Sequence, residues 1–92
     1  MHFEGLDIDE QILDKIESRH GVTVAEVLDA CSAERTHVRR GRDGLYRLYG
    51  RTDAGRFLLI VLVSLGGGVW KVATARGMTE QERRLYQRSM GE

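Results

Sequence analysis

The chain has 92 residues, of which 41% are hydrophobic and 30% are charged, with 14 basic and 14 acidic side chains. This length fits one domain spanning residues 1–92 around a single core, and the composition excludes an intrinsically disordered chain. The longest apolar run, residues 57–65, is too short to cross a membrane, and the N-terminal residues do not read as a signal peptide. The one cysteine cannot form an intramolecular disulfide, so these features together favour a cytoplasmic protein.

The zero net charge conceals two halves of opposite charge. Residues 1–34 contain nine acidic and two basic side chains, whereas residues 35–92 contain five acidic and twelve basic ones. Twelve of the fourteen basic residues are arginines, whose planar guanidinium binds phosphate or carboxylate through paired hydrogen bonds. The basic half therefore predicts an anionic partner, and the alternative is that the two halves neutralise each other in the fold.

The first third of the chain predicts two helices. In the first, Asp7 and Glu10 form a candidate capping pair and Gly21 marks the C-terminal stop. In the second, Thr23 and Glu26 form a capping box at the start. The apolar positions that recur at helical spacing are Ile8, Ile12, Leu13, Ile16, Val24, Val27, Leu28 and Cys31, and we expect Cys31 to be a small core residue.

From residue 36 onward the pattern changes to that of strands. Short turns containing glycine and aspartate separate four predicted strands, at residues 36–40, 45–51, 56–65 and 69–76. A third helix follows, opened by a capping box of Thr79 and Glu82. The predicted fold is therefore α+β, with two N-terminal helices, a four-stranded antiparallel meander sheet and a C-terminal helix.

Tight turns would pair Arg51 with Arg56 and Leu65 with Val69, and this register assigns each residue to one face of the sheet. One face is then apolar and packs on helices. The other face mixes arginines with aromatic residues, and its members include Arg47, Tyr49, Arg51, Arg56, Trp70 and Arg76.

This arginine-rich face predicts a binding surface for RNA. Arg51, Arg56 and Arg76 fall at one end of the sheet beside the start of the third helix, where free N–H groups also favour a phosphate. Tyr49 and Trp70 are candidates for stacking on unpaired bases. The alternatives are that the two rings cover the sheet beneath a helix, and that the arginines are solvated or form ion pairs with the acidic first helix.

A histidine is the natural candidate for proton transfer, because imidazole changes charge near neutral pH. His20 ends the first predicted helix, where it serves either as a C-terminal cap or as a proton acceptor. His37 is predicted on the strand face opposite the arginines. The sequence has no spacing typical of a metal site or a cofactor-binding loop, so neither a metal nor a cofactor is predicted.

Three segments, in order along the chain, resemble the BrnT-type toxin family, whose fold is similar to that of RelE-like ribonuclease toxins. They are RHGVTVAEV at 19–27, LYRLYGRTDAGRFLLIVL at 45–62 and TARGMTEQERRLYQR at 74–88. The family features are a Lys-His-Gly-Val turn, here Arg19-His20-Gly21-Val22, an apolar strand led by Gly-Arg, a Ser-Ala-Arg segment whose arginine is matched by Arg76, and a Glu-Arg-Arg-x-Tyr helix. The opening departs from the family, because Gly5 and Leu6 stand where a tryptophan and an aspartate are expected.

The resemblance implies a metal-independent endoribonuclease, the toxin of a type II toxin–antitoxin system, held inactive by a small DNA-binding antitoxin. Such cleavage uses the neighbouring 2′-hydroxyl as nucleophile, so it needs a proton acceptor and cations around the phosphate. His20 is the candidate acceptor, and Arg51 and Arg76 are the candidate catalytic cations. The candidate RNA-binding residues are Arg47, Tyr49, Arg56, Trp70, Arg83 and Tyr86.

Two other functions stay open at this stage. One is a non-catalytic module that keeps the toxin fold and binds RNA or a protein. The other is a regulatory subunit whose basic half docks an acidic partner or the acidic first helix of a second copy, which would make a homo-oligomer.

Overall fold

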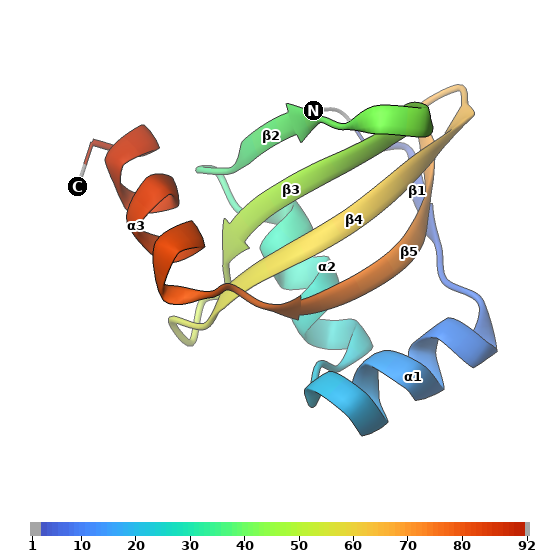
Figure 1. Cartoon of the computed structure of the whole chain (residues 1–92). Coiled ribbons are helices and arrows are strands. Elements are labelled where there is room, and N and C mark those ends of the chain that lie inside the picture. Colours follow the sequence, from blue (N-terminus) through green and yellow to red (C-terminus); the bar gives the residue numbers. More distant parts are fainter. Residues whose placement is uncertain (1–2, 92) are drawn as a thin grey trace.

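A five-stranded mixed sheet with helices on both faces forms the framework of the chain (Figure 1). The computed structural model describes residues 3–91. The elements in chain order are β1 (Gly5–Asp7), α1 (Glu10–His20), α2 (Val24–Ser32), β2 (His37–Arg40), the 3-10 turn η1 (Arg42–Gly44), β3 (Leu45–Arg51), β4 (Phe57–Gly66), β5 (Val69–Gly77) and α3 (Glu80–Ser89). The predicted α+β class and the three helices are confirmed. No helix within residues 3–91 has the length and apolar character needed to span a membrane.

The sheet contains one strand more than the predicted four-stranded meander. Strands β2 to β5 pair antiparallel in sequence order, as predicted, and β1 adds a parallel edge strand beside β5. Gly5 pairs with Val69 there, and the Glu4 N–H donates to the Gly68 carbonyl at 2.8 Å. Three residues are too few to show strand periodicity, and their partner lies more than 60 residues away, so no local pattern indicates β1.

The helix boundaries follow side-chain caps. Thr23–Glu26 and Thr79–Glu82 both form complete capping boxes, as predicted. Gly21 ends α1 in the left-handed conformation with a φ of 63°, which glycine adopts without steric cost. The start of α1 differs from the prediction, because the Asp9 side chain caps the helix by accepting from the Gln11 N–H.

Helices α1 and α2 cover one face of the sheet and enclose the main hydrophobic core (Figure 1). Its buried members are Ile16, Val22, Val27, Ala30, Cys31, Leu48, Leu58, Ile60, Leu62, Val72 and Ala75. Helix α2 lies so close to β3 that a Cβ on Gly50 would stand 2.7 Å from the Ala30 carbonyl oxygen. Burial in this core raises the pKa of the Cys31 thiol to about 12, which fits the predicted role as a small core residue.

The register of the two central hairpins differs from the prediction by one residue. Arg51 pairs with Phe57 instead of Arg56, and Val69 pairs with Gly66 instead of Leu65. In the first hairpin the Thr52 N–H donates to the Arg56 carbonyl, so the turn contains one residue more than was assumed. Because successive side chains alternate between faces, this shift moves Arg56 to the side of α2.

Trp70 is also on a different face from the one predicted. The β4–β5 pairing shifts between Val61, which faces Thr74, and Leu62, which faces Val72, so the strand carries a β-bulge. Beyond the bulge Trp70 packs with the main core, where its ring contacts Tyr46 edge-on at 5.0 Å between centroids. The predicted grouping of Trp70 with the arginines is therefore wrong.

Helix α3 packs over one end of the opposite sheet face (Figure 1). Tyr49, Leu59 and Tyr86 are buried in this second cluster, and partly buried residues pack around them, namely Phe57, Val61, Met78 and Met90. The rest of this face carries Arg47 and Thr74 at positions paired across Val61. We call this side of the sheet, including Arg39, Arg47, Arg51 and Arg76, the α3 face.

Candidate active site

Two arginines converge on one phenyl ring at the end of the sheet beneath α3. The Arg51 guanidinium carbon lies 5.1 Å from the Phe57 ring centroid, and that of Arg83 lies 4.2 Å from it. The face of an aromatic ring attracts a cation, so Phe57 holds two positive charges near each other. Phe57 is itself fixed by an edge-on contact with Tyr86 at 5.9 Å. Arg51 and Arg83 are both exposed residues.

Arg76 lies at the same end of the sheet and binds Glu82 of α3. Its two terminal nitrogens lie 2.7 and 3.0 Å from the two carboxylate oxygens. Glu82 also accepts from the Thr79 N–H at 2.8 Å, so the carboxylate joins β5 to the first turn of α3. The hydrogen bond to Glu82 raises the pKa of Arg76, and the same contact holds the pKa of Glu82 below its ordinary value. Arg76 is therefore a fixed cation whose charge is balanced, with its side chain 35% exposed.

The structure brings His37 to this face, which the sequence analysis placed on the opposite one. His37, Tyr49, Leu59 and Arg76 stand directly opposite one another on successive strands. Three inter-strand spacings make the backbone distance from His37 to Arg76 about 14 Å. A cavity of about 30 Å³ lies beside His37 and Tyr49, and its lining also includes Arg39 and the Arg76 partner Glu82. His37 and Arg39 are two residues apart on one strand, so their side chains share a face. The pairing of Arg39 with Arg47 therefore places His37 on the α3 face as well.

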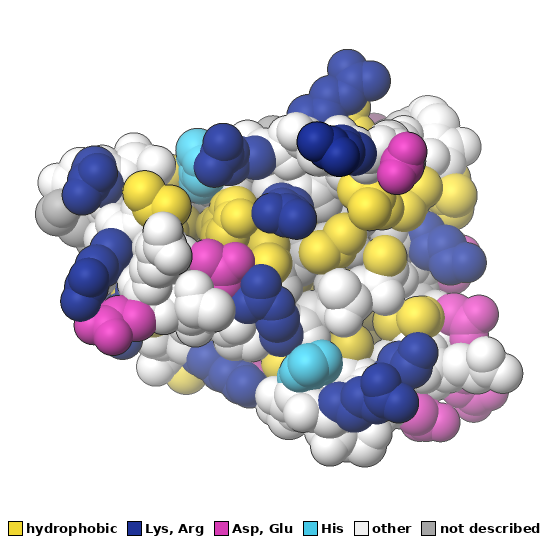
Figure 2. Space-filling view, in the orientation of Figure 1, with side chains coloured by type: hydrophobic (Ala, Val, Ile, Leu, Met, Phe, Trp, Pro, Cys, Tyr) yellow, Lys and Arg dark blue, Asp and Glu magenta, His cyan; other side chains and the backbone are white. Residues whose placement is uncertain are grey.

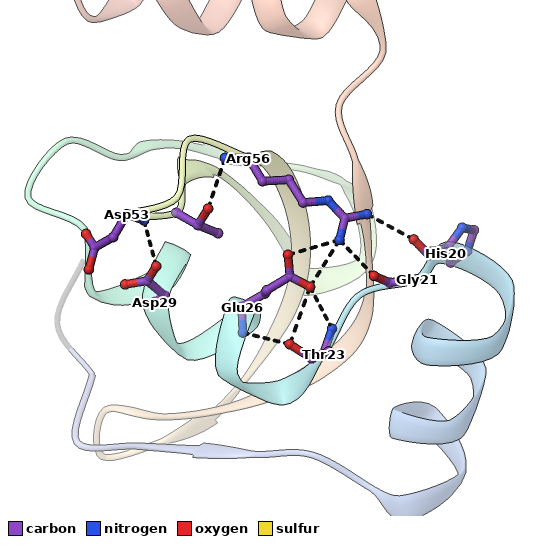
Figure 3. Close-up of polar contacts among 8 residues, drawn as sticks. His20, Gly21, Thr23, Glu26, Asp29, Asp53 and Arg56 are labelled. Atoms are coloured by element: carbon purple, nitrogen blue, oxygen red, sulfur yellow. Dashed lines mark hydrogen bonds and ion pairs between the residues drawn. The ribbon is translucent and has the colours of Figure 1, made fainter.

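Arg56 acts as a clamp on the turn between α1 and α2 (Figure 3). Its guanidinium donates to the carbonyls of Gly21 at 2.7 Å and His20 at 3.1 Å, and both Glu26 oxygens accept from it at 3.0 Å. Glu26 is also the capping-box residue of α2; its hydrogen bond to the Thr23 N–H, followed by that to Arg56, lowers its pKa. Arg56 therefore lies at the same end of the sheet as Arg76 but on the other face.

His20 takes part in this clamp through its backbone. The carbonyl oxygen binds Arg56, while the exposed imidazole projects from the last turn of α1, away from the guanidinium (Figure 3). Helix α1 belongs to the layer that packs on the main core, whereas Arg76 faces α3. The structure thus separates His20 from Arg76 into different layers of the fold.

The aromatic residues predicted to stack on bases are packed in the interior. Tyr49 is 8% exposed and Tyr86 is 4% exposed beneath α3. The Tyr86 hydroxyl donates to the Arg35 carbonyl at 2.8 Å, which ties α3 to the loop before β2. Trp70 contacts Phe3 and Tyr46 on the far side of the sheet. The alternative interpretation, that Tyr49 and Trp70 pack against the sheet, therefore describes these two rings.

A cleft of about 710 Å³ lies beside Arg51, between the C-terminal end of α2, the turn after β3 and the C-terminal end of α3. Its charged lining combines Arg35 and Arg51 with carboxylates of Asp29, Glu34 and Asp53. The Asp53 N–H donates to Asp29 at 2.7 Å and holds the turn against α2. Within residues 3–91 no three histidine, cysteine, aspartate or glutamate side chains gather as a metal site would require.

The fold is similar to that of a solved toxin. No family model and no curated protein matches the sequence. The crystal structure of the Brucella abortus ribonuclease toxin BrnT superposes with a TM-score of 0.69 at 13% sequence identity. The match covers 83% of this chain and 97% of the toxin chain. The resemblance read from the sequence is therefore confirmed at the level of the fold, and the chain has the architecture of BrnT.

Proposed function

We propose that the chain is the toxin of a type II toxin–antitoxin system, a metal-independent endoribonuclease that acts on RNA in the cytoplasm. The observation that carries the proposal is the gathering of Arg51, Arg76 and Arg83 at one end of the α3 face, within a fold similar to a ribonuclease toxin. Guanidinium groups bind phosphate oxygens through paired hydrogen bonds, so three of them at one place suit an RNA backbone.

In the proposed reaction the 2′-hydroxyl oxygen of one nucleotide attacks the adjacent phosphorus. The P–O bond to the 5′ oxygen of the next nucleotide breaks, and this oxygen takes a proton from water, which leaves a 2′,3′-cyclic phosphate and a 5′-hydroxyl end. Arg51 and Arg83 hold the phosphate, and Arg76 balances the charge that develops on its oxygens. Because Glu82 occupies both arms of Arg76, the phosphate has to share this guanidinium with the carboxylate.

The proton of the 2′-hydroxyl requires an acceptor, for which two histidines compete. His20 is the residue that the family resemblance favours, and Arg56 then serves as a positioning residue that holds the His20–Gly21 turn. His37 is the candidate that shares a face and a cavity lining with the Arg76 partner Glu82. A small DNA-binding antitoxin is the proposed inhibitory partner, and pairing with a second copy of the chain is a further possibility for its regulation.

A non-catalytic RNA- or protein-binding module is the second candidate function. Two observations favour it: Glu82 satisfies Arg76, and His20 lies in a different layer from Arg76. A module of this kind would bind through the same arginines without cleaving its ligand.

Expression of the chain in growing cells distinguishes a ribonuclease toxin from a non-catalytic binding module. The proposal predicts growth arrest by the wild-type chain and normal growth with Arg76→Ala. Arg84→Ala is the matched control, because Arg84 forms a 2.6 Å ion pair with Glu80 on the exposed side of α3 and should keep the toxicity. Normal growth with the wild type present at the same level as Arg76→Ala would favour the binding module.

A further inference from the structure

A second group of arginines lies at the hairpin between β2 and β3, away from the cluster around Phe57. Residues 35–51 contain six arginines and a single acidic residue, Asp43. Arg39 and Arg47 stand directly opposite each other on the α3 face, and both side chains are exposed. Arg40 leans on the Tyr46 ring, with 5.8 Å between its guanidinium carbon and the ring centroid. Arg40 and Tyr46 are on the other face of the hairpin, so we call only Arg39 and Arg47 the hairpin arginines.

Folding alone does not account for this arrangement. Like charges directly opposite on neighbouring strands destabilise a sheet. Among residues 3–91, the ion pairs that form join Arg56 to Glu26, Arg76 to Glu82 and Arg84 to Glu80, so no carboxylate of the described chain neutralises the hairpin arginines. The repulsion between Arg39 and Arg47 is therefore not relieved by any carboxylate of residues 3–91, and a bound anion would relieve it.

The hairpin arginines line a small polar hollow. Its volume is about 160 Å³, and its lining consists of Arg39, Arg40, Gly41 and Arg47. The pairing of the two strands holds the Arg39 and Arg47 side chains on the same face before any ligand binds. The Arg39 and Arg47 side chains, which share the α3 face, suit a compact anion with several acceptor oxygens, and phosphate has that chemistry.

We propose that the hairpin arginines bind a backbone phosphate of single-stranded RNA, as a contact separate from the cluster around Phe57. Arg47 and Arg76 are both on the α3 face, two strands and two residues apart, which places their backbones about 12 Å from each other. The surface between them consists of partly buried Val61 and Thr74, and Figure 2 shows basic side chains around hydrophobic ones on this face. An RNA strand bound at Arg76 thus reaches the hairpin arginines across the open sheet.

Phosphate fits these observations better than an acidic protein does. A protein interface usually has an apolar centre with a polar rim. The exposed large hydrophobic residues within residues 3–91 are Val24, Leu28, Leu65, Val69 and Leu85, and none of them lines the hollow. The inference takes its ligand class from the proposed function, but it concerns binding and not cleavage.

The test is the affinity of the full chain for a fluorescent 2′-O-methyl RNA 20-mer, measured by anisotropy at several salt concentrations. This RNA lacks the free 2′-hydroxyl and cannot be cleaved by the proposed reaction. The measured affinity therefore does not depend on whether the chain is a ribonuclease. The double variant Arg39→Gln/Arg47→Gln should bind about tenfold more weakly at low salt. The slope of log affinity against log salt should be shallower by about 0.7, because one phosphate contact on a single strand is lost.

The matched control is Lys15→Gln/Arg19→Gln, which removes the same two charges from exposed positions of α1. It should leave the affinity and the slope close to those of the wild type. The thermal midpoint of Arg39→Gln/Arg47→Gln should equal or exceed that of the wild type, because the repulsion is gone, and so misfolding cannot explain the loss.

Three results would overturn the inference. The first is unchanged RNA affinity in Arg39→Gln/Arg47→Gln, and the second is an equal loss in the α1 control. The third is binding of polyglutamate, but not of RNA, that depends on Arg39 and Arg47, since the ligand would then be an acidic protein.

Discussion

Arg76 and Glu82 form a two-pronged ion pair, with nitrogen–oxygen distances of 2.7 and 3.0 Å, that joins β5 to the first turn of α3. The same carboxylate completes the capping box of α3 by accepting from the Thr79 N–H. One side chain therefore fixes both the position of the helix and the orientation of the arginine. This relationship links the stability of the C-terminal helix to the candidate active site.

Glu82→Gln should lower the free energy of unfolding at pH 7 by about 1 kcal/mol, a value reduced for the partial exposure of the pair. The pKa of Glu82 is held below its ordinary value of 4.5, chiefly by Arg76. A lowered pKa contributes stability that is present above 4.5 and is lost as the pH falls through the folded-state pKa. Urea unfolding of both proteins should therefore show a difference at pH 7 that shrinks below pH 4.5.

Glu80→Gln is the control for this experiment, because the Glu80–Arg84 pair is exposed on both sides. It should change the unfolding free energy little at either pH. A difference for Glu82→Gln that stays constant into acid would show that the ion pair is not the source of its effect.

Arg56→Ala should lower the free energy of unfolding by about 1 kcal/mol, because four hydrogen bonds to the α1–α2 turn and Glu26 are lost and the site is partly exposed. Arg56→Lys keeps the charge but not the planar fork, so it should recover only part of the loss. Arg19→Ala, an exposed change in the last turn of α1, is the comparison. Equal stability of Arg56→Ala and Arg19→Ala in urea unfolding would rule out the clamp.

Gly50→Ala should lower the free energy of unfolding by about 1–3 kcal/mol, because the added methyl group collides with the Ala30 carbonyl of α2. Gly77→Ala places a methyl group in strand β5, where the nearest atom lies at 3.9 Å, and it should be tolerated. Thermal unfolding of the two variants compares the sites directly. A Gly50→Ala protein as stable as Gly77→Ala would mean that α2 lies farther from β3 than described.

Cys31 should not react with a thiol-specific reagent at pH 8 while the chain is folded. Burial raises the pKa of this thiol to about 12, so the reactive thiolate is almost absent. Absorbance of a disulfide reagent such as dithiobis-nitrobenzoate should report one thiol in denaturant and essentially none without it. Fast labelling of the folded chain would contradict the packing of Cys31 between α2 and the sheet.

The features read correctly from the sequence are those set by neighbouring residues. Thr23 with Glu26 and Thr79 with Glu82 are three positions apart, so their capping boxes can be recognised from the chain alone. The register of the sheet depends instead on the number of residues in each turn. One extra residue before Phe57 was enough to send Arg56 to the other face.

The candidate site was predicted only in part, because several of its positions depend on the register of the sheet and on tertiary packing. Arg51 and Arg76 do share the α3 face, and Arg83 joins them through Phe57. The face on which Trp70 lies depends on a β-bulge in the β4–β5 pairing. The face of His37 depends on how β2 pairs with β3. Local residue spacing indicates neither the bulge nor this pairing. The burial of Tyr49 depends on where α3 packs, which is a tertiary contact.

The central claim is that this chain cleaves RNA without a metal ion. The most direct test is incubation of the purified chain with single-stranded RNA, and with translating ribosomes, in the presence of EDTA. Cleavage should yield 2′,3′-cyclic phosphate ends, and folded Arg76→Ala should lose about 100- to 1000-fold in rate. Loss in His20→Ala or in His37→Ala would identify the proton acceptor. Absence of cleavage by the wild type on both substrates, or a folded Arg76→Ala protein that cleaves at the wild-type rate, would contradict the account.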